Sequence, residues 1–509
     1  MMRLWLIFLS LFSSISLGDP IHVIQVVDAA THRGVPCVHL ETNNHISLWT
    51  DSNGIAVFDE PGLMNSKVFF TITSDGYEYP KDGFGYAGVA IDTTANAKTI
   101  IKVHRTDNAE RLYRITGEGI YSDTIRAGAL AGVAIPISHP LLDGGVLGQD
   151  TVETVTYRNK LYWFWGDTEI AKYPLGNFRT TGATSELPGH GGLDPAMGVD
   201  LKYFTDSTGL PRPMATGLPP DGPVWIDALM VLTDPAGKDR LICKFARVHD
   251  LVGIYQRGLL QWNDTSEQFE PLIDFDKTNP LIPSAQPIRV HESDGDYFYF
   301  PSPYAIIRVP ADWKSVLDQH QYEAFTCLKP GARFNDAAGA QLDRDANGQL
   351  IWAWKRDTGP VDENAQKQLL KAKKISASET WFNLRDEHGA SVQLHAGTVC
   401  WNAYLHKWLL IAHEVRGHPS LLGEVWMSTA DHPWGPYRKA VKIATHQNYT
   451  FYNVVQHPQF DQMGGRIIYF EGTYTNTFSA NDSPTPRYDY NQIMYRVDLS
   501  DRRLKYAEQ

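Results

Sequence analysis

The chain has 509 residues, of which 43% are hydrophobic and 20% charged, a globular composition with enough length for two or three domains. The formal net charge of −12 and the lack of a basic stripe disfavour a nucleic-acid partner. The sequence contains no P-loop, no dinucleotide-binding glycine pattern and no serine-hydrolase elbow, so those chemistries have no support.

The N-terminus has the pattern of a targeting segment. Arg3 is followed by the apolar stretch from Leu4 to Leu17 and then by small residues up to Gly18. We therefore expect a signal peptide over residues 1–18, cleavage after Gly18, and export as a secreted or periplasmic protein. The apolar stretch is too short to span a bilayer comfortably and no second one follows, so a stable membrane span is not expected.

The four cysteines are far apart and lack the spacing of a metal site. They are Cys37, Cys243, Cys327 and Cys400. Only one of them falls in the first domain described below, so a fully paired disulfide framework is disfavoured. The sequence predicts buried free thiols.

Residues 19–106 form a unit of short β-type segments separated by turns. Asn53-Gly54 lies between two of these segments and is typical of a tight hairpin turn. About seven such elements in so short a stretch predict a small antiparallel β-sandwich. Residues 107–118 are expected to link this unit to a larger one.

A spaced motif in this first unit resembles the carboxypeptidase-regulatory-like, transthyretin-like β-sandwich. The matching residues are Asp28, Thr31, Gly34, Val35, Pro36, Thr50, Asp51 and Gly54. The resemblance covers this segment only and carries no catalytic residues. It implies an accessory or docking domain.

Residues 119–509 repeat a loose pattern of polar turn, hydrophobic strand and terminal acid or polar residue. Four of these stretches start at residues 291, 345, 401 and 463, at intervals of 54, 56 and 62 residues. That period fits the four strands of a propeller blade. We expect a five-bladed β-propeller whose C-terminal strand pairs back near the start of the domain, and helices only near residues 313–322 and 364–374. The fold class is all-β.

The stretch GQDTVETVTYRNKLYWFWGDT, residues 148–168, contains an aromatic strand flanked by two acids. Residues 158–160 are typical of a hairpin turn, and the apolar run from Leu161 to Trp165 predicts a buried strand. Asp150 precedes the first strand of this hairpin and Asp167 ends the second. Antiparallel pairing should bring them to one edge of a sheet. Paired carboxylates of this kind can perform acid/base or nucleophilic work on glycosides, although Asp also commonly ends turns.

Two further residues near the C-terminus are candidates. Glu471 ends the apolar segment RIIYF and is followed by Gly472, which suggests a rim position and a raised pKa suited to a general acid. A carboxylate satisfied by backbone N–H groups is the structural alternative. Arg487, in PTPRYDYN, is a candidate partner for a funnel carboxylate or an acidic group of the substrate, or else a surface arginine.

Other motifs resemble the five-bladed propeller glycoside hydrolases of the arabinanase-like and arabinofuranosidase-like groups. These motifs are WNAYLHKW from Trp401, ADHPWGPY from Ala430 and GLLQWNDTSEQFEPL from Gly258. The ending W-G-D-T, with an acid on the strand before it, resembles the propeller endo-D-arabinanase group. That resemblance implies Asp150 and Asp167 as the catalytic pair.

The arabinanase-like resemblance instead implies three acids from different blades, for which Asp227, Glu424 and Glu471 compete. Asp227 and Glu424 are then expected to contact the substrate even where they are not catalytic. Trp165, Trp225 and Trp401 are candidates for stacking on sugar rings, or for packing inside blades.

The sequence thus predicts a secreted glycoside hydrolase acting on a complex polysaccharide or oligosaccharide, with pentose-containing polysaccharides as one candidate class, and with no cofactor and no metal. One alternative is a glycan-binding propeller without catalysis. Another is a metal-dependent hydrolase or lyase, which would need histidines converging on the propeller axis. The histidines considered for that role are His139, His190, His395, His446 and His457.

Overall fold

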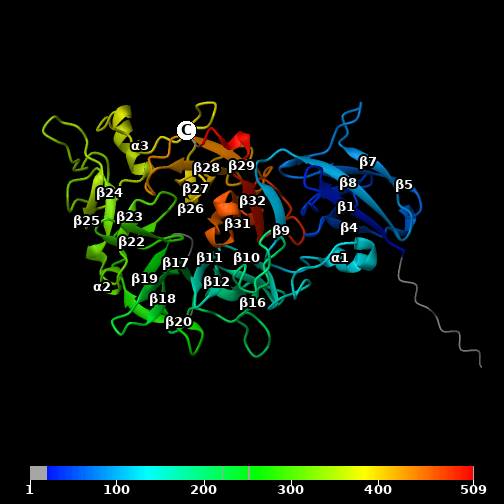
Figure 1. Cartoon of the computed structure of the whole chain (residues 1–509), viewed down its shortest axis with the longest axis horizontal. Coiled ribbons are helices and arrows are strands. Elements are labelled where there is room, and N and C mark those ends of the chain that lie inside the picture. The colour runs from blue at the N-terminus through cyan, green and yellow to red at the C-terminus, as the bar shows by residue number, and fades with distance from the viewer. Residues whose placement is uncertain (1–19, 220–221, 250–252, 508–509) are drawn as a thin grey trace, which may run out of the picture.

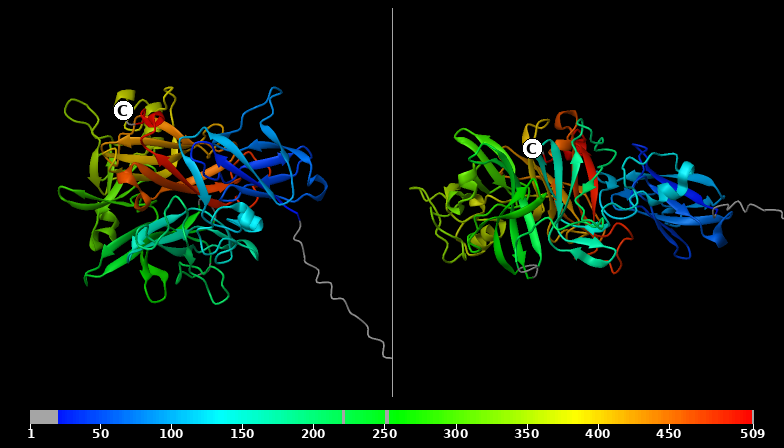
Figure 2. Two further views of the ribbon diagram at one scale, coloured as in Figure 1. Left: turned by 45° about the vertical axis from the view of Figure 1, so that its right-hand side comes forward. Right: turned by 90° about the horizontal axis from the view of Figure 1, so that it is seen from below.

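The computed structural model describes residues 20–219, 222–249 and 253–507. The predicted signal peptide lies outside the described residues. The chain forms a small β-sandwich beside a large β-propeller, drawn in blue and in cyan to red in Figure 1, and Figure 2 shows the same two parts from other sides. No helix in the described part of the chain is long and apolar enough to cross a membrane.

The sandwich consists of two four-stranded sheets, ordered β4-β1-β8-β6 and β3-β2-β5-β7. The strands are β1 (His22–Asp28), β2 (His39–Thr42), β3 (Ser47–Trp49), β4 (Ile55–Phe58), β5 (Lys67–Thr73), β6 (Tyr77–Glu78), β7 (Gly88–Asp92) and β8 (Ala97–Arg105). Alternating apolar residues of both sheets, such as Val26, Leu40 and Phe70, share one core. The expectation of a wholly antiparallel sandwich is wrong in one respect, because β1 and β8 pair in parallel.

Gly34 and Gly54 of the sandwich motif lie where two turns contact each other. A Cβ on Gly34 would lie 1.9 Å from the carbonyl oxygen of Asn53, and one on Gly54 would lie 2.4 Å from that of Val26. Gly54 also has a φ of +72°. Both positions therefore require glycine, which gives this part of the motif a structural cause.

Five sheets form the blades of the propeller. Blade one is β11 (Glu153–Tyr157), β12 (Lys160–Trp165), β15 (Thr181–Glu186) and β16 (Lys202–Tyr203). Blade two is β17 (Val224–Thr233), β18 (Asp239–Val248), β19 (Ile254–Asn263) and β20 (Gln268–Asp274). Blade three is β21 (Ile288–Glu292), β22 (Gly295–Phe300), β23 (Ile307–Pro310), β24 (Glu323–Thr326) and β25 (Ala353–Arg356). Blade four is β26 (Leu394–Asn402), β27 (Lys407–Glu414), β28 (Val425–Ala430) and β29 (Ala440–Ala444). Blade five is β30 (Thr450–Gln456), β31 (Ile467–Thr475), β32 (Asn491–Asp498) and β9 (Glu110–Arg114).

The fifth blade is completed by a strand from the start of the domain. β9 pairs with β32, so the C-terminal strand does pair back. Residues 110–114 of the expected linker are thus a blade strand. Glu110 accepts hydrogen bonds from Thr31 of the sandwich at 2.8 Å and from Arg496 of the propeller at 2.6 Å. β9 therefore joins both parts.

The repeat expected to start at residue 345 is not a separate blade. It contributes β25, the outer fifth strand of blade three. The hairpin at Trp401 likewise belongs to blade four. The strand-turn-strand pattern recurs within blades as well as between them, so counting hairpins gave the right number of blades with wrong boundaries.

Short segments complete the fold. A small sheet of β10 (Val146–Gln149), β13 (Thr168–Ile170) and β14 (Tyr173–Asn177) lies at the end of blade one. The α-helices are α1 (Ser122–Ala127), α2 (Trp313–Val316) and α3 (Glu363–Lys371). The last two fall within or beside the two expected helical stretches. The side chains of Asp312 and Asp362 cap them by accepting N–H bonds.

The first strands of the blades lie around a common axis. Gln286, just before β21, hydrogen-bonds to Thr154 of β11, and the N–H of Gln456 on β30 donates to Thr398 of β26 at 3.0 Å. These bonds join different blades through their innermost strands. All four cysteines are buried free thiols, as expected.

Candidate functional site

Asp150 and Asp167 are neighbours at one end of blade one. Asp150 lies between β10 and β11, and Asp167 between β12 and β13. The N–H of Asp167 donates to Asp150 Oδ1 at 3.1 Å, and the N–H of Gly166 donates to the Asp150 carbonyl at 2.8 Å. Both side chains are half-buried. The turn at Arg158 and Asn159, both with positive φ, sets the register that aligns the two ends.

The close approach of these two loops depends on a glycine. A Cβ on Gly166 would lie 2.4 Å from Asp150 Oδ1, which is closer than carbon and oxygen can come. The residue between the aromatic strand and Asp167 must therefore lack a side chain. This explains the glycine in the W-G-D-T ending.

Two tyrosines from blade five surround Asp150. The hydroxyl of Tyr452, on β30, donates to Asp150 Oδ2 at 2.6 Å. Tyr490, which has a φ of +57°, accepts the N–H of Gln149 on its carbonyl oxygen at 2.7 Å. Burial raises the pKa of Asp150, whereas hydrogen bonds from the hydroxyls of Tyr452 and Tyr490 and from the N–H of Asp167 lower it.

Asp167 has fewer hydrogen-bond donors around it. Burial and, to a smaller extent, the nearby Asp150 carboxylate raise the pKa of Asp167 to about 6, against the opposing effect of the Trp225 indole, which lowers it. That indole N–H lies 3.4 Å from Asp167 Oδ1. Asp150 accepts more hydrogen bonds, so the negative charge of the pair is favoured on Asp150 and the remaining proton on Asp167.

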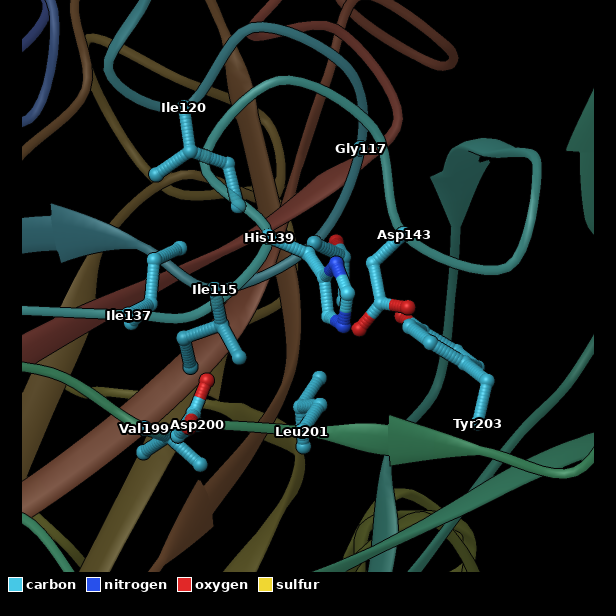
Figure 3. A pocket seen from close by; sticks show the side chains of 11 residues that line it. Ile115, Gly117, Ile120, Ile137, His139, Asp143, Val199, Asp200, Leu201 and Tyr203 are labelled. Atoms are coloured by element: carbon cyan, nitrogen blue, oxygen red, sulfur yellow. The ribbon is translucent and has the colours of Figure 1, made fainter.

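The candidate His139 lines a small cavity. The cavity has a volume of about 20 Å³ and is lined by residues that include Asp143 and Tyr203. Figure 3 shows His139 and Asp143 side by side within it. The Tyr203 hydroxyl donates to Gln149, next to Asp150, at 2.7 Å. A cavity of this size holds roughly one water molecule and no sugar, so its residues line no substrate site, and Tyr203 connects it to the residue before Asp150.

Asp227 lies on β17 near a third acid, Glu153 of β11. Asp227 Oδ2 is 2.6 Å from Lys244 Nζ, and Asp227 Oδ1 is buried with no hydrogen-bond partner among the described residues. Burial and the charge of Asp227 hold the pKa of Glu153 well above its usual range, and Lys244 opposes this shift. These three residues join blades one and two beside the axis.

Glu471 is placed in the interior of blade five. Its side chain has 0% exposed surface, and its Oε1 lies 2.6 Å from Nε2 of the equally buried His457. Burial raises the pKa of Glu471. A carboxylate with no exposed surface cannot touch a substrate, so the expected rim position is wrong.

Glu471→Gln is expected to leave any catalytic rate of the Asp150–Asp167 pair within about twofold of wild type, because the side chain is enclosed in the blade. The free energy of unfolding should fall by roughly 1–3 kcal/mol, because the short bond to His457 is weakened. Chemical unfolding and initial rates on the same preparation measure both. A hundredfold loss of rate at unchanged stability would restore Glu471 to the catalytic site.

Glu424 faces the sandwich and not the pair. It is buried, lies 2.6 Å from Lys442 Nζ and accepts a hydrogen bond from Thr445. The N–H of Thr445 in turn donates to Asp107, the residue that follows the sandwich, at 2.9 Å. Its expected contact with substrate is therefore replaced by a role at the interface between the two parts.

Three other candidates also lie away from the pair. Trp165 is fully buried and stacks on Trp163 inside blade one. Trp401 is 47% exposed and is the last residue but one of β26. The next residue, Asn402, donates to the carbonyl of Gly465, at the end of blade five remote from Tyr452. Arg487 lines a crevice between the propeller and the sandwich. Of the three tryptophans, only Trp225 is beside the carboxylates.

Sequence reasoning missed Tyr452, Tyr490 and Glu153. No local motif marks the tyrosines, because both approach Asp150 from more than 300 residues away in the chain. Glu153 is only three residues from Asp150, but its importance depends on the neighbouring blade. The signal that would have found it is an acid at the first position of an innermost strand.

The histidines do not converge. Among residues 20–219, 222–249 and 253–507, no three His, Cys, Asp or Glu side chains are placed to hold a metal ion. His446 is buried, and burial lowers its pKa to about 3. His457 is paired with Glu471.

The fold and site define a two-part all-β protein with a five-bladed propeller and a carboxylate pair at one end of a blade.

No protein-family profile matches the chain, and no curated protein sequence matches it. Several solved structures are similar in fold. An exo-1,5-α-L-arabinanase from a bovine ruminal metagenomic library has 10% identity and a TM-score of 0.33, over 69% of this chain and 94% of its own. An exo-β-1,3-galactanase from Phanerochaete chrysosporium has 11% identity and a TM-score of 0.36, over 72% and 64%. An arabinanase from Bacillus subtilis has 12% identity and a TM-score of 0.31, over 68% and 93%.

Proposed function

We propose that the protein is a glycoside hydrolase that acts on a complex polysaccharide through Asp150 and Asp167. The observation that carries this proposal is the asymmetry of the pair. Two adjacent carboxylates share one end of a blade, one accepting hydrogen bonds that favour its charged form and the other with a pKa raised to about 6. Opposite protonation of two neighbouring acids is what glycoside hydrolysis requires.

In this mechanism Asp167 is the acid. Its proton passes to the glycosidic oxygen as the bond to the leaving sugar breaks, so that the leaving group departs neutral. Asp150 is the nucleophile or the base: it attacks the anomeric carbon directly or removes a proton from an attacking water. The hydroxyls of Tyr452 and Tyr490 keep its carboxylate charged and oriented.

Trp225 is proposed to position both the acid and the sugar. Its indole N–H donates to Asp167, and the side chain is half-buried beside the pair. Asp227, two residues further along β17, is held by Lys244 through Oδ2, and its side chain is 26% exposed; we propose that it contacts substrate hydroxyls through Oδ2. Pentose-containing polysaccharides are the first substrates to test, because the W-G-D-T ending resembles endo-D-arabinanases.

The test is product release from plant, algal and bacterial polysaccharides by the mature protein. The Asp150→Asn and Asp167→Asn variants serve as blanks, with folding checked by thermal melting. Oligosaccharides released by the wild type and by neither folded variant are the expected result. Release of oligosaccharides by both folded variants would show that Asp150 and Asp167 are not the catalytic pair. Binding of the protein to a glycan without cleavage would favour a binding module.

The hydrolysis rate is expected to fall as pH rises through about 6, because Asp167 must be protonated to act as the acid. Trp225→Phe removes the hydrogen bond that lowers the pKa of Asp167, so the alkaline limb should move to higher pH. The measurement is kcat/KM against pH, with Trp401→Phe as a matched tryptophan control. An alkaline limb that Trp225→Phe leaves in place would contradict the assignment.

We also propose that the protein is exported, with the sandwich as an accessory domain. The support is the charged and apolar pattern of residues 1–18 and the motif shared with regulatory sandwiches. N-terminal sequencing of secreted protein should begin at Asp19. Retention of residues 1–18 on the secreted chain would reject the cleavage site.

A further inference from the structure

A crevice of about 300 Å³ lies between the sandwich and the propeller. The sandwich contributes Trp49 on β3, the segment around α1 contributes Ser122 and Arg126, and the propeller contributes Arg114 and Arg487. Its volume is at the lower limit of ordinary small-ligand sites. None of these residues takes part in the proposed hydrolysis.

Arg114 is a buried cation without a carboxylate partner. Its side chain donates to the backbone carbonyls of Arg487 and Glu118, and its guanidinium lies 5.2 Å from the ring centre of Tyr488. The residue is 2% exposed, its Nε has no hydrogen-bond acceptor, and it belongs to none of the ion pairs among the described residues. Burial lowers its pKa to about 10. An uncompensated buried charge is costly, so an oxyanion in the crevice would stabilise it.

Arg487 adds a second, more accessible guanidinium. Its side chain is 45% exposed, donates to Ser122 and lies 3.5 Å from Glu118. The charge of Arg487 lowers the pKa of Arg114, so the two guanidiniums repel each other. Arg126 also lines the crevice but is already paired with Asp59 at 2.6 Å and Asp123 at 3.1 Å.

The acids of the crevice do not neutralise Arg114. Asp51 accepts the N–H groups of Asn53 at 3.0 Å and Thr124 at 2.6 Å, so its oxygens are occupied by backbone donors. Asp123 is paired with Arg126 and accepts the N–H of Val57. Asp51 and Asp123 therefore have partners of their own. Glu118 lies 3.5 Å from Arg487, and its charge also raises the pKa of Arg114, so one carboxylate is shared by two guanidiniums and a net positive charge remains for a ligand of opposite sign.

Trp49 gives the crevice an aromatic wall. Its indole stacks on His39 with ring centres 4.4 Å apart and planes inclined by 15°, which fixes its orientation. An amphipathic aromatic ring of this kind suits the apolar face of a sugar, and adjacent hydroxyls such as that of Ser122 suit its polar edges. An aromatic wall beside two guanidiniums fits a ring that carries a carboxylate.

We propose that this crevice binds a carboxylate-bearing sugar unit, a uronate, as an accessory site for an acidic polysaccharide. Arg487 and Arg114 bind the carboxylate and Trp49 stacks on the ring. The choice of a glycan as ligand rests on the proposed function, whereas the anion preference rests on the crevice itself. The sandwich would thereby help to hold the chain that the propeller cuts.

The test is calorimetric titration of the full mature chain carrying Asp150→Asn, so that the ligand stays intact. The probes are glucuronate and galacturonate oligosaccharides, a neutral oligosaccharide of the same length, and inorganic phosphate. Acidic oligosaccharides should bind at least tenfold more tightly than the neutral one and than phosphate. Trp49→Ala and Arg487→Gln should each weaken that binding about tenfold, whereas the matched Trp401→Ala and Arg503→Gln should not.

Equal binding of neutral and acidic chains would overturn the carboxylate preference, and equal binding of phosphate would overturn the sugar. Acidic-oligosaccharide binding that Trp49→Ala and Arg487→Gln leave as unchanged as the two controls do would overturn the location in the crevice. Hydrolysis is measured separately on the wild type. Uronate binding without any hydrolysis would reject the glycosidase and retain the crevice, and hydrolysis without uronate binding would do the reverse.

Discussion

Replacing Asp150 by asparagine is expected to lower kcat by roughly 10³–10⁴-fold, because the variant loses the nucleophile or base of the proposed reaction. Asparagine has the same shape and can still accept the N–H of Asp167 through its oxygen, so the thermal unfolding midpoint should change little. Tyr452 and Tyr490 remain in place, which makes the loss specific to charge. The measurement is initial rate on the best polysaccharide from the panel.

The same substitution also tests the coupling within the pair. Removing the charge of Asp150 removes a cause of the raised pKa of Asp167, so the alkaline limb of any residual activity should move to lower pH. The matched control is Asp482→Asn, an exposed aspartate far along the chain from either acid. A rate within tenfold of wild type for a folded Asp150→Asn protein would remove Asp150 from the mechanism.

The second large effect is on stability and concerns Arg111 of β9. Its buried guanidinium donates to the carbonyls of Pro36 at 3.0 Å and Asp75 at 3.1 Å, and also to Ser74. All three partners are in the sandwich, whereas Arg111 is in a propeller blade. Arg111→Met leaves several buried acceptors unsatisfied, and the free energy of unfolding is expected to fall by roughly 3–5 kcal/mol.

Urea unfolding monitored by tryptophan fluorescence measures this loss, and Arg503→Met is its control. Arg503 is exposed and bonded mainly to its neighbour Asp501, so the control should stay within about 0.5 kcal/mol of wild type. If the sandwich and propeller are held together by β9, Arg111→Met should also separate their unfolding into two transitions. An unchanged single transition would show that Arg111 does not carry the interface.

The sequence predicted those parts of the molecule that depend on local pattern. The alternating strand pattern and the Asn53-Gly54 turn predicted the sandwich. The aromatic hairpin around Arg158 predicted that Asp150 and Asp167 lie next to each other. The pairing back of the C-terminal strand was predicted because a ring of blades must be closed. Each of these follows from spacing within a few tens of residues or from a general property of the architecture.

The rest depends on contacts between blades, which no local pattern encodes. Glu471 follows an apolar run in the sequence just as Asp167 does, but β31 continues past it to Thr475, and its side chain is buried against His457. Tyr452 approaches Asp150 from the neighbouring blade five. Arg487 has the sequence surroundings of a funnel residue, yet the loop that holds it packs against the sandwich. Side-chain direction at a strand end is set by whichever element packs beside it.

The closing strand imposes an order on synthesis. β9 leaves the ribosome early, but Glu110 bonds Arg496, a residue 386 positions later. During translation β9, the first strand of the ring to be synthesised, has no partner until β32 is synthesised. The folded sandwich, which contacts β9 through Arg111, can keep β9 ordered until then. The N-terminal sandwich would then act as a template for ring closure. A propeller expressed from residue 119 onward would lack strand β9 of blade five as well as the sandwich.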